Sequence, residues 1–400
     1  MSLWDNFHYQ LAHRHKIDGL PILFVSHMVR QVAFVFLGLF SPLYIFELAK
    51  GNGLTTSSAL AGTFFFFWIT FLVKLIGLPL AENLSVRFGF KSTILLSGVP
   101  FFVFLPLLVL GAGNPILLLP AAIIWGLYDA TFWWGYHGFF VRAGDPSSYG
   151  REMGILNILS TIIVVISPIL GALVVDAFGF SALFLVAGVA MALSLFLILP
   201  AAEHKPRIDI TLAGTLKVMW EHKNMALAYV GYGAESSVLG TVWPLFLFII
   251  LGKTLEVGGV ISGATLAAAV MGLAIGTWVD KRGLKGEKQL VSLGAPLIAA
   301  TWFIRAFSRS VPALVGIDAV YRFVGQLVWL PLDLLSYRKA TEGGGVNQAM
   351  MFRQIGITVG PIIITGILIF WVLLGGSLST FFILTAVVAL LPLLAVRKED

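Results

Sequence analysis

Four ionisable residues stand near the middle of long apolar stretches of this sequence. They are Arg30, Asp129, Glu235 and Arg322. A charged side chain at the centre of a bilayer costs about 2.5–3.5 kcal/mol on insertion scales, so it faces a water-filled cavity or a partner of opposite charge. Two acids and two bases at this depth can hold a charged solute, take up a proton or form ion pairs. We therefore expect binding and proton-coupling chemistry at these positions.

Each of the four charges shares a polar face with residues three or four positions away, which is about one helical turn. The other members of these faces are His27, Gln31, Trp133, Tyr136, His137, Tyr232, Asp318 and Gln326. We expect the four faces to line one chamber, with aromatic side chains completing its walls. The aromatic candidates are Tyr128, Trp134, Trp243, Tyr321 and Trp329.

A structural role is the alternative at these positions. Arg322 can pair with an acid one turn away, Arg30 can pair with an acid on a neighbouring helix, and the aromatic rings can simply pack helices together. Three further cations lie nearer the ends of apolar stretches. We expect Lys74 and Arg353 to extend to the cytoplasmic surface and Arg305 to extend to the outer surface.

These residues must be positioned by helices that cross a membrane. The sequence has 400 residues, of which 58% are hydrophobic and 12% charged, and a water-soluble domain cannot bury that much apolar surface. A membrane-spanning helix needs about 20 apolar residues, and the alternating pattern of a β-barrel is missing from the sequence. Twelve stretches are long enough. They cover residues 20–46, 58–80, 91–111, 115–141, 153–176, 181–200, 225–251, 257–279, 289–307, 311–336, 347–374 and 378–396.

The sequence repeats itself in two halves. LGLFSPLYIF at residues 37–46 matches LGTVWPLFLF at residues 239–248, and RFGFK at residues 87–91 matches KRGLK at residues 281–285. Such a repeat predicts two pseudo-symmetric six-helix bundles with a central site between them. The predicted units are an N-terminal segment 1–19, a bundle 20–200, a linker 201–224, a bundle 225–396 and a tail 397–400.

The distribution of Lys and Arg predicts the orientation in the membrane. Most of the 26 Lys and Arg residues fall in segments on one side, which include both termini, whereas the opposite loops hold only Lys50, Lys253 and Arg309. Positively charged loops stay in the cytoplasm. We therefore expect both termini to be cytoplasmic. We further expect the protein to be a monomer in a prokaryotic plasma membrane. This bias also accounts for the net charge of +6, so no nucleic-acid partner is expected.

Motifs for metal, cofactor or covalent chemistry are missing from the sequence. Cysteine is absent, which excludes thiolate metal ligands and a cysteine nucleophile. The sequence also has no glycine-serine nucleophile elbow, paired-histidine zinc motif or phosphate-binding loop. We expect neither enzyme activity nor a bound metal or cofactor.

Twelve helices in two parallel halves, with a basic turn after the second and eighth helices, resemble the major facilitator superfamily. GTWVDKRGLK at residues 276–285 is similar to the loop signature of that family. The resemblance implies that the helices carrying the four central charges line a central cavity. It also implies that the loop is a gate, with Asp280 latching the outward-open state; the alternative is that the loop only sets topology and turn geometry. The gating residues implied in this loop are Gly276, Asp280, Lys281, Arg282, Gly283 and Lys285.

The corresponding loop of the first half departs from the family pattern. It keeps Arg87, Gly89 and Lys91, but Val86 occupies the position of the acid. The nearest carboxylate is Glu82, which is the candidate substitute.

SPILGA at residues 167–172 resembles a degraded form of the glycine-proline signature that proton-driven exporters of the family carry on the fifth helix. Gly360 and Pro361 repeat it in the second half. This resemblance favours export. The alternative is structural, because small residues and a proline permit close helix packing and a bend.

Together these features predict a secondary active transporter that moves a small organic solute by alternating access. Coupling to protons and efflux of drugs or metabolites are favoured. Glu235 is expected to carry the proton and Asp129 to hold substrate or a salt bridge, with the reverse assignment as an alternative. The sequence is also compatible with proton-coupled or facilitative uptake of a sugar or organic anion, with a lipid flippase and with a non-transporting sensor. The expected partners are the solute, protons or another coupling ion, and the lipid bilayer.

Overall fold

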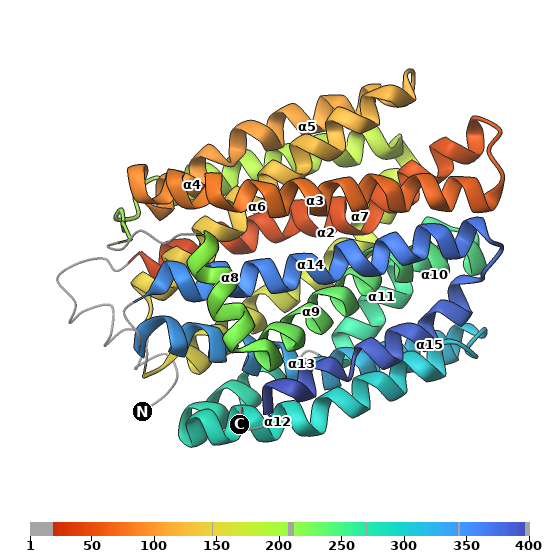
Figure 1. Cartoon of the computed structure of the whole chain (residues 1–400). Helices are drawn as coiled ribbons and strands as arrows, with labels where there is room; N and C mark the ends of the chain where they lie inside the picture. Colours follow the sequence, from red (N-terminus) through yellow and green to blue (C-terminus); the bar gives the residue numbers. More distant parts are fainter. Residues whose placement is uncertain (1–18, 146, 207–211, 269–270, 343–344, 397–400) are drawn as a thin grey trace.

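The computed structural model describes residues 19–145, 147–206, 212–268, 271–342 and 345–396. Within helices, the side chains of residues 157–158, 267–268, 271–280, 283–284, 336–342 and 346 are outside the description. The described chain consists of helices joined by short turns (Figure 1). The predicted N-terminal segment, apart from Gly19, and the predicted tail lie outside the described residues.

The predicted spans of the first half all fall on helices. These are α2 (Leu20–Gly51), α3 (Thr56–Phe88), α4 (Phe90–Leu96), α5 (Gly98–Leu110), η1 (Pro115–Leu117), α6 (Leu118–Ala143) and α7 (Tyr149–Ile198). Gly179 has φ +80° and ψ 172° inside α7, so the helix breaks there into the two spans predicted on either side. Only glycine adopts such a conformation at no steric cost.

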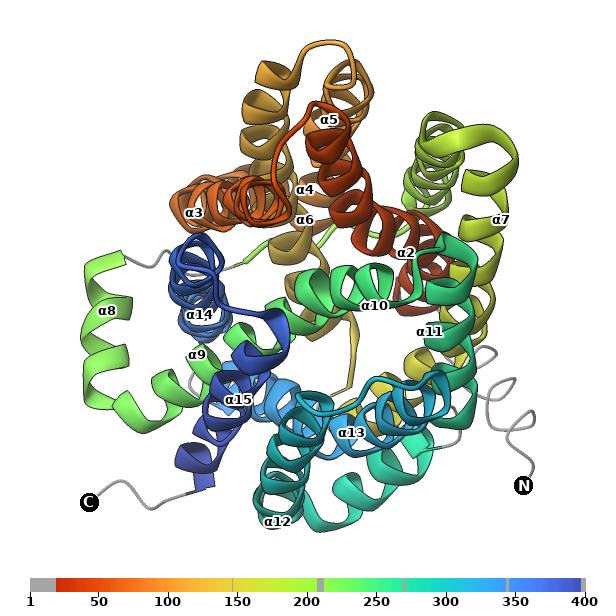
Figure 2. The same cartoon turned by 90° about the vertical axis from the view of Figure 1, so that its right-hand side faces the viewer.

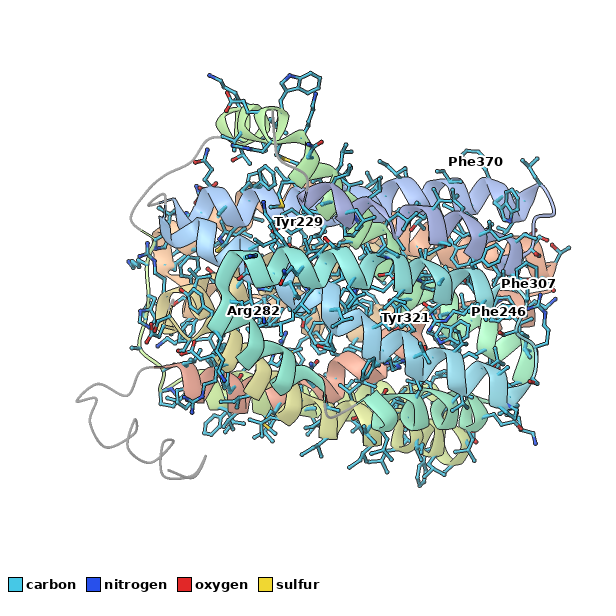
Figure 3. All side chains as sticks on the ribbon, turned by 90° about the horizontal axis from the view of Figure 1, so that it is seen from below. Tyr229, Phe246, Arg282, Phe307, Tyr321 and Phe370 are labelled. Atoms are coloured by element: carbon cyan, nitrogen blue, oxygen red, sulfur yellow. The ribbon has the colours of Figure 1, made fainter. Side chains whose placement is uncertain are left out.

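The second half follows the same plan. After the linker helix α8 (Leu212–Glu221), its helices are α9 (Lys223–Ser237), the π-helical turn η2 (Val238–Val242), α10 (Trp243–Leu251), α11 (Thr254–Ala268), α12 (Met271–Arg305), α13 (Val311–Glu342), α14 (Val346–Leu373), α15 (Leu378–Val388) and η3 (Leu391–Val396). Residues 276–285, where the sequence predicts a turn, have helical backbone within α12, and the chain changes direction there (Figure 3). Figure 3 shows the two arms of α12 meeting near Arg282 at one end of the molecule.

Nine helices of the described residues are long and apolar enough to cross a membrane. Their outer surfaces carry large apolar side chains, among them Ile76, Phe196 and Phe370, each about two-thirds exposed or more. Figure 3 shows Phe307 and Phe370 at the periphery. An exposed apolar surface of this extent is stable only against lipid.

The helices form two groups around a central axis, with α2–α7 on one side and α9–α15 on the other (Figure 2). The groups meet where α3 packs against α14 and where α7 packs against α11. The described chain begins with α2 and ends with η3 at the same end of the molecule (Figure 1), as expected for an even number of crossings. The short helix α8 lies outside both groups (Figure 2).

Glycines allow helices to touch backbone to backbone at two of these contacts. A Cβ on Gly360 of α14 would lie 2.0 Å from the carbonyl oxygen of Val230 in α9. A Cβ on Gly258 of α11 would lie 2.5 Å from the carbonyl oxygen of Pro168 in α7. The segments that resemble an exporter signature therefore pack helices in this structure, which is the structural alternative raised by the sequence.

Gly360→Ala is expected to lower the free energy of unfolding by about 1–3 kcal/mol, because the added methyl group must push α14 away from the backbone of α9. Unfolding of the purified protein in detergent micelles would measure this loss. Gly259→Ala is the matched control, since nothing lies within 4 Å of its Cβ position. Equal stability of the two variants would contradict the close contact.

Candidate functional site

A cavity of about 390 Å³ lies between the two helix groups. Its walls come from α2, α3, α5 and α6 on one side and from α9, η2, α13 and α14 on the other. The aromatic lining residues are Phe34, Phe66, Phe67, Phe71, Phe104, Trp125, Trp133 and Tyr232. Aliphatic hydroxyl groups come from Ser41, Thr70, Ser236, Ser237 and Thr241. The ionisable lining residues are Lys74, Asp129, His137, Asp333 and Arg353.

One ion pair in the cavity wall joins α3 to α6. Lys74 Nζ lies 2.7 Å from Asp129 Oδ2, and the two side chains are 9% and 14% exposed. The prediction that Lys74 extends to the cytoplasmic surface is wrong, because pairing with Asp129 stabilises the ammonium at its own depth.

A second ion pair joins α13 to α14. Arg353 donates from Nε to Asp333 Oδ1 at 3.1 Å and forms a closer contact with the same oxygen through Nη2. Arg353 Nη1 also lies 3.2 Å from His137 Nε2. Since the guanidinium can only donate, His137 Nε2 accepts this hydrogen bond, which crosses from one helix group to the other. The prediction that Arg353 extends to the surface is therefore wrong as well.

Arg30 of α2 lies outside the cavity lining and is 1% exposed. Its Nη2 lies 2.6 Å from His27 Nδ1, and its guanidinium carbon lies 3.2 Å from the ring centre of Phe132 and 4.7 Å from that of Phe34. No carboxylate of the described residues forms an ion pair with Arg30. The alternative prediction of an acid opposite Arg30 is therefore wrong.

Glu235 also lies outside the cavity lining and is 3% exposed. Its Oε1 accepts hydrogen bonds from Trp302 Nε1 at 2.6 Å and from the Tyr321 hydroxyl at 2.5 Å. Both donors belong to the same helix group as Glu235, so this carboxyl group is held inside the second half.

A buried charge cluster lies beside Glu235. Arg305 and Asp318 are both fully buried and form an ion pair, and Arg322 Nε donates to Asp318 Oδ2 at 2.8 Å. The Arg305 guanidinium also packs against the rings of Trp243, Trp302 and Tyr321. Figure 3 shows Tyr321 within the helix bundle. The predicted pairing of Arg322 with Asp318 is confirmed, whereas the prediction that Arg305 extends to the outer surface is wrong.

The prediction of one chamber lined by all four polar faces is wrong. The cavity includes Asp129, Trp133, His137 and Tyr232. The predicted polar residues outside its lining are His27, Arg30, Gln31, Tyr136, Glu235, Asp318, Arg322 and Gln326. The predicted aromatic walls Tyr128, Trp134, Trp243, Tyr321 and Trp329 are outside it too. The physical reason is that Glu235, Asp318 and Arg322 find partners within their own half.

The sequence analysis did not select Lys74, Arg353 or Asp333 as lining residues. The available signal was that all three lie inside predicted apolar spans, where a long cation can reach an acid on a neighbouring helix. The wall hydroxyls of Thr70 and Thr241 gave no such signal, because single hydroxyl residues are common in membrane helices.

The turn between α3 and α4 is stabilised by an acid that the sequence analysis did not select. Glu203 Oε1 and Oε2 accept hydrogen bonds from the backbone N–H groups of Lys91 and Ser92, each at 2.9 Å. Gly89 precedes α4 with φ +100°, and a Cβ there would lie 2.2 Å from the Glu203 carboxylate. Glu203 thus caps α4 where the loop lacks its own acid.

Other predicted residues of this loop also contact the segment that follows α7. Lys91 Nζ donates to the carbonyl oxygen of Ala201 at 2.8 Å, and the carbonyl oxygen of Arg87 accepts from Lys205 Nζ at 3.0 Å. The carbonyl oxygen of Glu82 accepts from the Ser85 hydroxyl at 2.7 Å. The first residues of the linker predicted at 201–224 therefore form hydrogen bonds with the loop between α3 and α4.

In the second loop for which gating is predicted, Lys281, Arg282 and Lys285 are exposed. The side chains of Gly276, Asp280 and Gly283 lie outside the described residues. The proposed latch of Asp280 therefore stays a prediction.

Glu203→Ala is expected to lower the free energy of unfolding by about 0.5–2 kcal/mol, the usual loss for a removed helix cap. Thermal unfolding in detergent would measure it. Glu221→Ala provides the control, because its carboxylate is 52% exposed and lies 3.9 Å from Lys217, and such surface pairs contribute little. A loss in Glu203→Ala no larger than that of the control would refute the capping role.

The described residues contain no group of three His, Asp or Glu side chains placed to hold a metal ion. What they do contain is a cavity between two groups of membrane-spanning helices, with polar groups contributed by both. This arrangement defines the class of membrane transporters built from two repeated bundles.

Comparison with known proteins identifies the family. The model of the Major Facilitator Superfamily matches residues 21–361, and the chain belongs to this family. Its all-α membrane fold is thereby confirmed. The curated proteins searched contain no match to the sequence.

Two solved structures have a similar fold. The human organic anion transporter MFSD10 (TETRAN) has a TM-score of 0.70 at 14% identity, covering 96% of this chain and 100% of that chain. The transporter FucP, solved in the outward conformation, has a TM-score of 0.67 at 13% identity, covering 95% of this chain and 98% of that chain.

Proposed function

We propose that this protein is a secondary transporter that carries a small organic solute through the cavity by alternating access. The observation that carries the proposal is the His137–Arg353 hydrogen bond in the cavity wall, which joins the two helix groups. If the two helix groups move apart at this wall of the cavity, the His137–Arg353 hydrogen bond must break. The predicted units 20–200 and 225–396 are the two bodies that would move.

The coupling proton is proposed to act at Asp129 and Asp333. Both carboxylates line the cavity, and each forms an ion pair within its own half. Protonation of either acid would release Lys74 or Arg353, which would free that cation for a solute or for a new contact. Glu235 is a poorer candidate than the sequence suggested, because it lies behind the cavity wall and is 3% exposed.

Export, a cytoplasmic location of both termini in a prokaryotic plasma membrane and a monomeric state remain part of the proposal on sequence grounds. Uptake is the alternative direction. The similarity in fold to an organic anion transporter supports a small-molecule substrate.

Distance measurements between paired spin labels test the alternating movement. The sequence has no native cysteine, so cysteine pairs can be introduced without background. The pair Asn83/Lys285 reports on the end of the bundle that carries the turn after α3, and Asn52/Arg309 reports on the opposite end. All four residues are exposed. We expect one distance to lengthen when the other shortens, and the populations to shift with pH.

Substitutions in the same spin-label assay show which of the candidate acids carries the coupling proton. Asp129→Asn and Asp333→Asn should reduce the pH response, whereas Glu235→Gln should retain it. Distances that stay fixed at both ends under every condition would rule out the proposed transport cycle. A response lost only in Glu235→Gln would return the coupling role to that residue.

A further inference from the structure

Arg30 differs from the other buried cations of the structure. Lys74, Arg305, Arg322 and Arg353 each form an ion pair with an aspartate. Arg30 is buried to the same degree, yet no carboxylate of the described residues pairs with it. Because a buried charge without a counter-ion is strongly unfavourable, a partner absent from the protein itself is indicated.

Two buried polar groups at Arg30 lack a hydrogen bond of good geometry. Arg30 Nη1 and the hydroxyl of Tyr128 are both shielded from solvent and without a well-aligned partner. They lie close enough for only a weak hydrogen bond to each other. Arg30 Nη2 is occupied by His27 Nδ1 at 2.6 Å; since the guanidinium is the donor, this nitrogen is unprotonated and its ring adds no charge there. An arginine fork beside a hydroxyl is suited to the oxygens of a carboxylate or phosphate.

These two groups lie one layer behind the cavity. Phe34 and Trp133 line the cavity, and their ring centres lie 4.7 and 5.8 Å from the Arg30 guanidinium carbon. Arg30 therefore lies against two residues of the cavity wall, and rotation of their side chains would bring it nearer to a bound solute. Such a ring movement needs no change in the helix backbone.

We infer that the transported solute is a small organic anion, whose anionic group binds Arg30 and Tyr128 while its apolar body occupies the aromatic part of the cavity. This inference rests on the proposed transport function and names the substrate class. Phe66, Phe67 and Trp125 line the cavity and supply apolar surface for the body of the solute. Asp129 is paired with Lys74 at 2.7 Å and forms no ion pair with Arg30.

The charge of the solute follows from the same residues. The cavity wall contributes two cations and two carboxylates that already pair with each other, so Arg30 is left as the excess positive charge. A neutral solute would leave it unsatisfied, and a cation would be repelled. Binding of an anion would compensate the charge of Arg30.

Binding of a matched probe series to the purified protein tests this inference. Benzoate, benzamide and benzylammonium share one ring and differ in charge. Benzoate is expected to raise the melting temperature and to quench the tryptophan fluorescence, whereas the amide and the ammonium compound have little effect. Arg30→Met should weaken benzoate binding by about 10- to 100-fold, the range of a charge-assisted hydrogen bond. Arg30→Lys should recover part of the affinity, since it keeps the charge and loses the fork.

Arg309→Met is the matched control for the loss of one positive charge, because Arg309 is exposed and its guanidinium hydrogen-bonds to the carbonyl oxygen of Ser308. It should bind benzoate as the unchanged protein does. Without probe, Arg30→Met should melt no lower than the unchanged protein, since it removes an unpaired buried charge. Full benzoate affinity in Arg30→Met, equal binding of benzamide, or no benzoate binding to the unchanged protein would each overturn the inference.

A failure of the anion-binding inference can be distinguished from a failure of the transport proposal. If the solute is not an anion, the benzoate series fails while the two label pairs still exchange long and short distances with pH. If the protein does not alternate, the distances stay fixed whether or not benzoate binds at Arg30.

Discussion

Asp318→Asn is expected to lower the free energy of unfolding by about 3–5 kcal/mol, the largest loss of stability for any single substitution considered. Asp318 is fully buried and contacts both Arg305 and Arg322. Asparagine has nearly the same shape but no charge, so two arginines would lose their common counter-ion. Removing one partner of a buried ion pair leaves an uncompensated charge, which is the costly case.

Unfolding in mixed detergent micelles would measure this effect. Glu256→Gln serves as the control, because its side chain is 45% exposed and lies 3.8 Å from Lys253 at the surface. Its loss should stay within about 0.5 kcal/mol. Arg322→Gln should fall between the two, since Asp318 then keeps Arg305 as its partner. If Asp318→Asn unfolds like the control, the buried cluster does not stabilise the second half.

Replacing both Lys74 and Asp129 by apolar residues is expected to preserve the stability of the protein but to abolish its response to pH. Lys74→Met and Asp129→Leu should each lower the free energy of unfolding by about 3 kcal/mol, because each leaves one charge unpaired in the cavity wall. The double variant should recover most of that loss, since replacing both members of a buried pair by apolar residues is often neutral. It should nevertheless lose the pH response of the label distances.

This comparison decides whether the pair is structural or functional. A double variant that is stable and still shifts its distances with pH would show that the pair only holds α3 to α6. A double variant as unstable as the single ones would show that the two charges are stabilised by groups other than each other. The Asp333–Arg353 pair offers the same cycle on the opposite wall of the cavity.

The positions of the helices could be predicted from the sequence because they depend on local properties. In the part of the chain that the structure describes, every predicted apolar stretch falls mainly on helices. The structure divides several of them: the stretch 225–251, for example, covers α9, the π-helical turn η2 and α10. The turn after α3 was predicted from Gly89, whose φ of +100° requires glycine. A long apolar run must satisfy its backbone hydrogen bonds internally, so a helix is the only solution in lipid.

The cavity could be predicted only in part. Asp129, Trp133 and His137 line it as expected, but Arg30 and Glu235 do not. These helices are apolar on nearly every side, so the sequence carries little information about how each one is rotated about its axis. Rotation is fixed by packing, for example where Gly360 allows α14 to touch the backbone of α9.

By itself, the sequence determined that this chain spans the membrane as two repeated groups of helices, and that each charge inside a span needs a cavity or a partner. Only the tertiary structure decided whether each charge faces a cavity or has a partner, and which residue that partner is. Arg305 pairs with Asp318, Lys74 pairs with Asp129, and Arg30, which is just as deeply buried, forms no ion pair with a carboxylate of the described residues. The reason is that the cost of burying a charge is a property of the residue and its depth, whereas its compensation depends on helices that are distant in the chain.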